Sequence, residues 1–273
     1  MLNVGIFHKF AKLIGGNMRK ITFVLFIVMV STCVAFAQET HSRKFLLTGA
    51  SFASPNNGWF EIGCELAGAV PVNRAVGGEA IADAANRMIR GTLYSPQELE
   101  EMDALVIMQV HDFDVFDESQ LKVNYVDYAT PFDRSNYAAA FDYVIKRFLT
   151  DCYNLKFDED SRYYNTKAGK PAVVVLCTHW HDSRETYNTS VRKLGAKWGF
   201  PIVEFDENIG FSKNSTHPVT SEQVSMLFAN DKEVSGGIAF GWHPENGKDK
   251  YIQQRMGAIF AEAMRKIFPV DGK

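Results

Sequence analysis

Ser51 is the first residue of the chain whose type and setting suggest chemistry. It lies in the stretch 44–54, where an apolar run, Phe45 to Leu47, leads into a turn through Gly49 and Ala50. Ligands of an open α/β sheet gather at the carboxyl ends of its strands, so a hydroxyl held there by a glycine turn can meet a substrate. The same residues also fit an ordinary strand-to-helix turn with a capping serine. Ser51 is therefore a candidate nucleophile that other parts of the chain must support.

Two further groups supply what a nucleophilic serine needs. Nucleophilic hydrolysis requires an imidazole to take the serine proton and N–H donors to hold the oxyanion. His243 lies between Trp242 and Pro244, just ahead of the last predicted helix, and is either a base held by rigid neighbours or a helix-entry residue. Gly77-Gly78 opens an earlier predicted helix, where free N–H groups can donate to an anion. The sequence therefore predicts a site built from Ser51, His243 and the Gly78 region.

A pair of histidines suggests a different chemistry. His179, His181 and Asp182 follow an apolar run, and alternate histidines on an extended segment point the same way. Imidazole suits zinc, although a third ligand would have to come from another part of the chain. The favoured interpretation is that these residues line or rim the cleft, and the site is predicted to hold no metal.

Apolar runs and helical periodicities alternate along the chain and would position these groups. Candidate strands occupy residues 45–47, 70–73, 104–110, 172–177 and 201–205, with segments of helical apolar spacing between them and after them. This alternation predicts one doubly wound α/β domain with a largely parallel sheet. Residues 113–136 read as a long surface excursion that shapes a substrate pocket. Residues 206–236 read as a polar connection with a short helix near 224–228.

The order of these elements resembles the SGNH, or GDSL-type, hydrolase family over residues 44–268. The family's Gly-Asp-Ser block is matched by Gly49-Ala50-Ser51, and its second, glycine-containing block by residues 73–78. Its Gly-x-Asn-Asp block is matched by residues 109–112, and its Asp-x-x-His-Pro block by residues 240–244. The resemblance implies a three-layer α/β/α fold of flavodoxin-like type with a five-stranded parallel sheet. It also implies that Ser51 is the nucleophile and His243 the base, with oxyanion donors from Ser51, Gly78 and His111.

The chain departs from this pattern at three positions. Ala50 replaces an aspartate that is not the nucleophile. His111 replaces an asparagine whose amide helps to bind the oxyanion, and a neutral imidazole can donate one N–H there if its tautomer is right. Phe240 stands where the acid of the triad is expected. The acid would then be a carboxylate from elsewhere, with Asp206 and Glu245 as candidates, or a backbone carbonyl would orient His243.

The N-terminal segment predicts export. A basic pair, Arg19-Lys20, precedes a short apolar run over 21–30 and a small-x-small site at 35–37. This pattern is typical of a secretory signal that is too short for a spanning helix. We expect residues 1–37 to be removed and residues 38–273 to form a single secreted or periplasmic domain without a membrane span. Lipid attachment at Cys33 is the less favoured alternative.

Composition and motifs argue against nucleic-acid binding and against a nucleotide cofactor. The 273 residues are 46% hydrophobic and carry a formal net charge of -3, which gives no electrostatic footprint for nucleic acid. An odd number of cysteines follows the signal, and buried free thiols are favoured for Cys64, Cys152 and Cys177. No phosphate-binding loop is present, so no nucleotide cofactor is implied.

The sequence thus leads to a secreted serine hydrolase that cleaves an ester. A small-molecule or glycan ester is the expected substrate, plausibly an acetyl or other acyl ester of a carbohydrate, as the resemblance implies. The alternative is a degenerate relative that binds a glycan or cell-wall ligand without cleaving it. A weaker third hypothesis is a metal-dependent hydrolase that uses the histidines at 179 and 181 with Asp182.

Overall fold

The computed structural model describes residues 42–53 and 57–269. The expected signal over residues 1–37, the Cys33 alternative and Ser54 lie outside these residues. Described residues 42–269 belong to one compact unit. No helix within the described ranges is both long and apolar enough to cross a bilayer.

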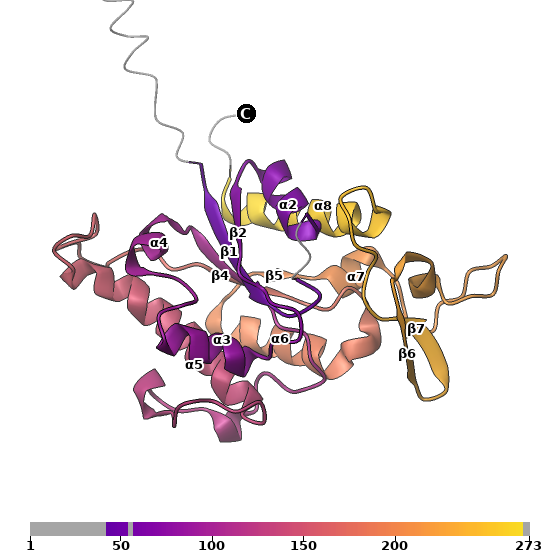
Figure 1. The fold of residues 1–273 in the computed structure, drawn as a ribbon, viewed down its shortest axis with the longest axis horizontal. Helices are drawn as coiled ribbons and strands as arrows, with labels where there is room; N and C mark the ends of the chain where they lie inside the picture. Colours follow the sequence, from indigo (N-terminus) through magenta and orange to yellow (C-terminus); the bar gives the residue numbers. More distant parts are fainter. Residues whose placement is uncertain (1–41, 54–56, 270–273) are drawn as a thin grey trace, which may run out of the picture. The chain divides into compact units, whose positions relative to one another are not determined.

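The unit is built on a five-stranded sheet in the order β2-β1-β3-β4-β5, and all four strand pairs are parallel (Figure 1). The strands are β1 (Lys44–Gly49), β2 (Val70–Asn73), β3 (Ala104–Met108), β4 (Val174–Cys177) and β5 (Ile202–Val203). Every residue of β3 and β4 is buried, which is why both read as unbroken apolar runs. The predicted doubly wound parallel sheet is confirmed.

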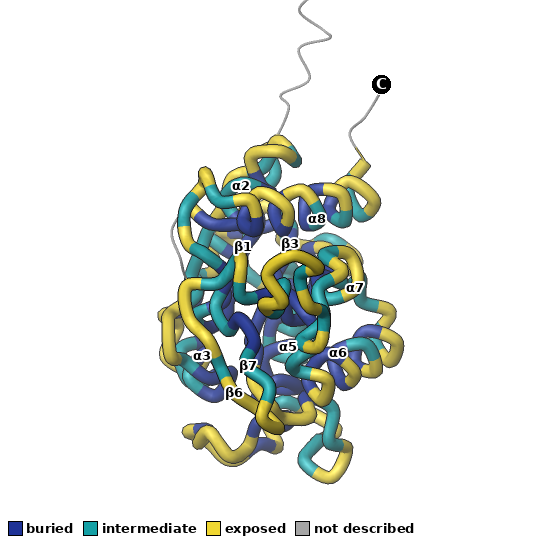
Figure 2. The backbone as a smooth tube through the Cα atoms, turned by 90° about the vertical axis from the view of Figure 1, so that its right-hand side faces the viewer, coloured by how far each residue is buried: buried dark blue, intermediate teal, exposed yellow. Residues whose placement is uncertain are grey.

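Helices cover both faces of this sheet, which gives three layers. Helices α2 (Trp59–Ala67) and α8 (Tyr251–Ile267) lie side by side on one face, and α3 (Ile81–Ile89), α5 (Tyr137–Asn154) and α6 (Glu185–Trp198) lie on the other (Figure 1). Figure 2 shows buried segments between the two helical layers. A Cβ added at Gly63 would lie 2.6 Å from the Phe260 ring, and one at Gly257 would lie 2.7 Å from Ile62. These two glycines therefore let α2 and α8 approach closely.

Two long connections, residues 109–136 and 206–236, join the main elements. Residues 109–136 contain only two 3₁₀ turns, η1 (Glu118–Gln120) and η2 (Tyr125–Asp127), as expected for a surface excursion. Helices α4 (Pro96–Glu101) and α7 (Phe205–Ile209), and the 3₁₀ turns η3 (Leu155–Phe157) and η4 (Asp182–Arg184), are short additions. The 3₁₀ helix η5 (Val224–Phe228) is at the predicted place.

A β-hairpin follows η5 and was not predicted. Its strands are β6 (Lys232–Ser235) and β7 (Ile238–Gly241), which pair antiparallel as a separate two-stranded sheet. The turn residues Gly236 and Gly237 have φ values of 59° and 79°. Gly-Gly between two short strands is a recognised two-residue hairpin signal, because both turn positions require positive φ. The description of 206–236 as a polar connection was therefore wrong for its last residues.

Candidate active site

Ser51 lies in the turn that follows β1. The backbone N–H of Ala53 donates to the carbonyl of Ala50 at 3.0 Å and closes this turn. A Cβ at Gly49 would lie 2.4 Å from the Met108 carbonyl oxygen of β3, so only glycine allows the backbone to turn this close to the neighbouring strand. The Asn73 side chain donates to the Ala53 carbonyl at 3.0 Å and ties the end of β2 to the turn.

The His243 imidazole meets the Ser51 hydroxyl directly. His243 Nε2 lies 2.8 Å from Ser51 Oγ, although the two residues are 192 positions apart in the chain. This distance lies within the range required of a nucleophile and its base. The ring of Phe52 stacks on that of His243 with centroids 4.8 Å apart, and Phe52 itself is 2% exposed. A buried aromatic side chain thus helps to hold the imidazole over the serine.

The carboxylate behind His243 belongs to Asp231, which the sequence analysis missed. Asp231 Oδ2 lies 2.7 Å from His243 Nδ1, and Asp231 Oδ1 accepts the backbone N–H of His243 at 2.7 Å. Partial burial acts to raise the pKa of Asp231, but the hydrogen bonds from His243 outweigh it and hold this pKa below its ordinary value. Asp231 is therefore ionised at neutral pH and can orient the imidazole and stabilise its protonated form.

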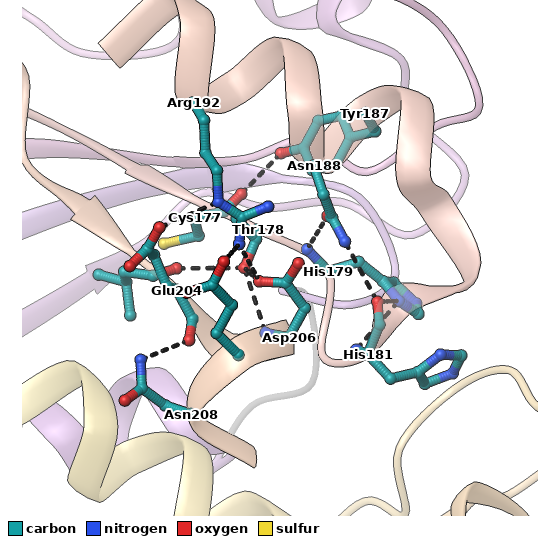
Figure 3. Close-up of polar contacts among 12 residues, drawn as sticks. Cys177, Thr178, His179, His181, Tyr187, Asn188, Arg192, Glu204, Asp206 and Asn208 are labelled. Atoms are coloured by element: carbon teal, nitrogen blue, oxygen red, sulfur yellow. Dashed lines mark hydrogen bonds and ion pairs between the residues drawn. The ribbon is translucent and has the colours of Figure 1, made fainter. Parts of the chain in front are cut away.

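The carboxylates considered from sequence have other partners. Asp206 Oδ1 accepts the Thr178 hydroxyl at 2.8 Å and Arg192 Nη2 at 2.7 Å (Figure 3). The Glu245 carboxylate pairs with Lys250 at 3.7 Å. Phe240 is 1% exposed and packs edge-on against the His181 ring. Asp231 replaces all of these candidates because the hairpin brings the residue before β6 opposite the residues after β7: the N–H of Trp242 donates to the Asp231 carbonyl at 2.9 Å.

A cavity of about 330 Å³ opens beside Ser51. Its lining includes the residues predicted as oxyanion donors, Ser51, Gly78 and His111. Gly78 has a φ of 81°, a conformation that suits glycine and that presents the loop backbone between β2 and α3 to the cavity. The Gln109 side chain donates to the Glu79 carbonyl at 2.7 Å and fixes this loop against the end of β3.

The environment of His111 selects one neutral tautomer. The N–H of Asp112 donates to His111 Nδ1 at 3.2 Å, so this nitrogen is an acceptor and the proton of the neutral ring is on Nε2. Burial, followed by the positive charge of Arg184, lowers the pKa of His111 below its ordinary value. The ring is therefore neutral at physiological pH and carries one N–H that is available for donation.

The remaining cavity wall is mixed: Ala50, Phe52, Val110 and Trp242 are apolar, and Glu79, Asp112, Arg184 and Glu233 are charged. It includes Arg184, whose Nη2 lies 2.6 Å from Glu233 Oε2 and whose Nη1 lies 4.0 Å from Asp112 Oδ2. The guanidinium carbon of Arg184 also lies 4.1 Å from the centroid of the Trp242 ring, which is the geometry of a cation–π contact. Arg184 and Glu233 were not singled out from sequence, since neither lies in a recognisable motif.

The histidine pair after β4 has a structural arrangement. His181 Nε2 donates to the Gly241 carbonyl at 2.7 Å, and His181 Nδ1 accepts the N–H of Ser183 at 3.2 Å. His179 is fully buried, and its Nδ1 donates to the His181 carbonyl at 2.9 Å (Figure 3). Over residues 42–53 and 57–269, no three His, Cys, Asp or Glu side chains are grouped so that they could hold a metal ion. Both ring nitrogens of His181 are used by the backbone, which leaves the metal hypothesis without support.

The three cysteines within the described ranges are buried free thiols, as favoured from sequence. Burial raises the pKa of Cys64 and Cys177 far above the ordinary value and that of Cys152 to about 11. The thiolate forms are thus suppressed, and these side chains act as small apolar groups of the core.

Fold and site together define the class. A flavodoxin-like parallel sheet between two helical layers carries a serine after β1 and a histidine just before the last helix, and this is the arrangement of an SGNH-type fold. The chain belongs to the family described as a domain of unknown function, DUF5040, whose model matches residues 42–268. No curated protein matches the chain.

Solved structures with a similar fold are distant from this chain. A protein of Desulfitobacterium hafniense assigned to the G-D-S-L lipolytic family has 12% identity and a TM-score of 0.45, over 81% of this chain and 99% of its own. The lipase Lip_vut3 from a goat rumen metagenome has 9% identity and a TM-score of 0.46, over 81% and 97% of the two chains. A carbohydrate esterase family 2 enzyme of Corynascus thermopiles has 12% identity and a TM-score of 0.42, over 82% of this chain and 66% of its own.

Proposed function

We propose that the protein is an exported serine hydrolase that cleaves short acyl esters, with an acetylated carbohydrate as the substrate class. The observation that carries this proposal is the hydrogen-bonded series Ser51 Oγ, His243 Nε2, His243 Nδ1 and Asp231 Oδ2, with spacings of 2.8 and 2.7 Å. This series contains a nucleophile, a base and an orienting carboxylate in the required order.

In the proposed reaction His243 accepts the Ser51 proton as Ser51 Oγ attacks the ester carbonyl. Asp231 stabilises the imidazolium that forms. The backbone N–H groups of Ser51 and Gly78 and the Nε2–H of His111 donate to the oxyanion. His243 then returns its proton to the leaving alcohol, and water, activated in turn by His243, hydrolyses the acyl-enzyme. Because His111 is neutral and Nε2-protonated, it supplies the single donor that replaces the asparagine amide.

The shape and polarity of the cavity favour a small acyl group on a polar alcohol. The cavity has a volume of about 330 Å³, and its apolar residues Phe52, Val110 and Trp242 suit a small acyl group. Its charged side chains of both signs offer donors and acceptors to the hydroxyls of a sugar. The alternative of a binding protein without activity was motivated partly by the absent acid, and Asp231 removes that motive.

The test is hydrolysis of 4-nitrophenyl acetate and of an acetylated oligosaccharide by a chain starting at residue 38. Ser51→Ala and His243→Ala should each reduce turnover by several orders of magnitude without changing the melting temperature by more than a few degrees. Equal rates for the wild type and Ser51→Ala would reject the hydrolase. The 4-nitrophenyl ester of a long-chain acid, used in parallel, should be a much poorer substrate than the acetate.

A further inference from the structure

The acid and the base of the site sit on an element that is separate from the main sheet. Asp231 directly precedes β6 and His243 follows β7 by one intervening residue, and these two strands pair only with each other among the described strands. Ser51, in contrast, is fixed at the end of a central strand of the main sheet. The distance between Ser51 Oγ and His243 Nε2 therefore depends on the contacts that dock this hairpin.

The loop after β4 provides the docking contacts at the β7 end. Trp180 Nε1 donates to the Trp242 carbonyl at 2.9 Å, and His181 Nε2 donates to the Gly241 carbonyl at 2.7 Å. The acceptors are backbone carbonyls of the last residue of β7 and of the residue after it, directly before His243. The ladder between the two strands carries β6, and Asp231 before it, along with β7.

Arg184, from the end of the same loop, contacts β6 and the residue that follows β7. Its Nη2 lies 2.6 Å from the Glu233 carboxylate in β6, and its guanidinium covers the Trp242 ring at 4.1 Å. Glu233 is two residues after Asp231, and Trp242 is the residue before His243. One side chain thus links the segment of the acid to the segment of the base.

The Arg184–Glu233 ion pair is more buried on its Arg184 side than an ordinary surface ion pair. The Arg184 side chain is 11% exposed, whereas exposed ion pairs contribute little because water screens them. Its Nε is buried with no hydrogen-bond partner among the described residues. An unpaired buried N–H costs free energy, so the guanidinium is held in a position that stability alone does not favour.

We propose that Arg184 is a positioning residue that sets the Asp231–His243 pair against Ser51 by clamping Glu233 and Trp242. This inference rests on the proposed hydrolase function for its kinetic consequences, but not for its structural ones. The β6–β7 ladder holds Asp231 and His243 together, so removal of the clamp frees the hairpin as a unit to move relative to the loop after β4. The imidazole then no longer faces Ser51 Oγ in the orientation that accepts the serine proton. A misplacement of about 1 Å can cost about 10²-fold in rate.

Arg184→Met is the main variant, because methionine keeps much of the packing on Trp242 and loses the charge. Its kcat on 4-nitrophenyl acetate should fall by about 10²-fold. Arg192→Met is the matched control. Arg192 lies in α6 and is 29% exposed, and it pairs with Glu204, Asp206 and Glu207 outside the cavity (Figure 3). Its loss should lower the melting temperature while kcat remains that of the wild type.

Two readouts separate positioning from a general loss of structure. Low, non-denaturing guanidinium chloride should partly restore kcat in Arg184→Ala, since the ion can fill the vacated space, and should not restore the Ser51→Ala variant. Glu233→Gln should lower kcat similarly, and the double variant with Arg184→Met should be no worse than either single variant. Glu233→Gln also serves if Arg184→Met does not fold.

An NMR measurement makes the test independent of catalysis. The ¹⁵N resonance of His243 Nε2 reports its hydrogen bond with the Ser51 hydroxyl, and it should be the same in the wild type and Arg192→Met and shifted in Arg184→Met. An unshifted resonance together with wild-type kcat in Arg184→Met would overturn the positioning role. Equal activity of the wild type and Ser51→Ala would reject the hydrolase alone, and the resonance would then decide the role of Arg184.

Discussion

Replacement of Asp231 by asparagine tests the residue on which the geometry of the site depends most. One carboxylate oxygen accepts the backbone N–H of His243 and the other faces His243 Nδ1, each at 2.7 Å. The asparagine side chain has only one oxygen, and this oxygen must accept the backbone N–H of His243. The amide NH₂ must therefore face Nδ1, which forces the imidazole proton onto Nε2. An Nε2–H cannot accept the Ser51 proton.

The expected loss follows from this change of tautomer. In serine hydrolysis the corresponding substitution preserves geometry and lowers kcat by about 10⁴-fold, which corresponds to about 5 kcal/mol of transition-state stabilisation. KM should change much less, since Asp231 acts through His243. The melting temperature should change little, because the Asp231 side chain is 49% exposed and water screens its contact with His243.

The assay is initial-rate hydrolysis of 4-nitrophenyl acetate over a range of substrate concentrations, beside Asp206→Asn. Asp206→Asn disturbs the bonds to Thr178 and Arg192 and should keep a wild-type kcat. If Asp231→Asn stays within about tenfold of the wild type while Ser51→Ala is inactive, the assignment of the acid is wrong. A loss of activity in Asp206→Asn with retained folding would point to the same conclusion.

Three further predictions address the oxyanion donor, the serine turn and the buried imidazole. His111→Ala should lower kcat by about 10²- to 10³-fold and His111→Asn, which restores an amide donor, by less; equal rates in all three proteins would exclude His111 from oxyanion binding. Gly49→Ala places a Cβ 2.4 Å from the Met108 carbonyl oxygen and should lower the free energy of unfolding in urea by about 1–3 kcal/mol; an unchanged value would contradict this crowding. Burial, and then the nearby His181, hold the pKa of His179 well below 6.5. The unfolded chain therefore takes up a proton that the folded protein does not. The stability from this residue is full above pH 6.5 and is lost as the pH falls below 6.5. Urea titrations at pH 7 and pH 5 should show a smaller difference for His179→Gln, and an identical difference would contradict the assignment.

Local patterns were sufficient for the sheet and for three of the four sequence blocks of the site. Strands β3 and β4 are buried on both faces, so they have apolar residues at successive positions and can be recognised as unbroken apolar runs. Gly49, Ser51 and Gly78 follow strands of a parallel sheet, and the carboxyl ends of such strands necessarily meet at one edge. The serine turn and the glycine loop could therefore be placed together without coordinates.

The turn of the β6–β7 hairpin can be recognised in the sequence, but its two strands cannot. Gly236-Gly237 between two short segments is a turn signal, but β6 is mostly exposed, β7 is buried only at its last two residues, and neither segment shows an apolar alternation. Without the hairpin, the carboxylates expected to reach His243 are those near it in the chain, such as Glu245, and at the end of β5, such as Asp206. Antiparallel pairing instead places Asp231, twelve positions before the histidine, beside its ring.

The sequence by itself determined the order of the strands along the chain, the buried layers and the residue types capable of hydrolysis, because these depend on periodicity and on turns a few residues long. Tertiary structure alone decided which carboxylate serves His243, which tautomer His111 adopts and how Arg184 joins the hairpin to the cavity. The first and third features depend on distances of 2.6–4.1 Å between segments that are 12 to 192 positions apart, and the tautomer depends on the local backbone conformation that turns the N–H of Asp112 toward His111 Nδ1. No local pattern encodes such distances, because they are set by how the hairpin packs against the loop after β4.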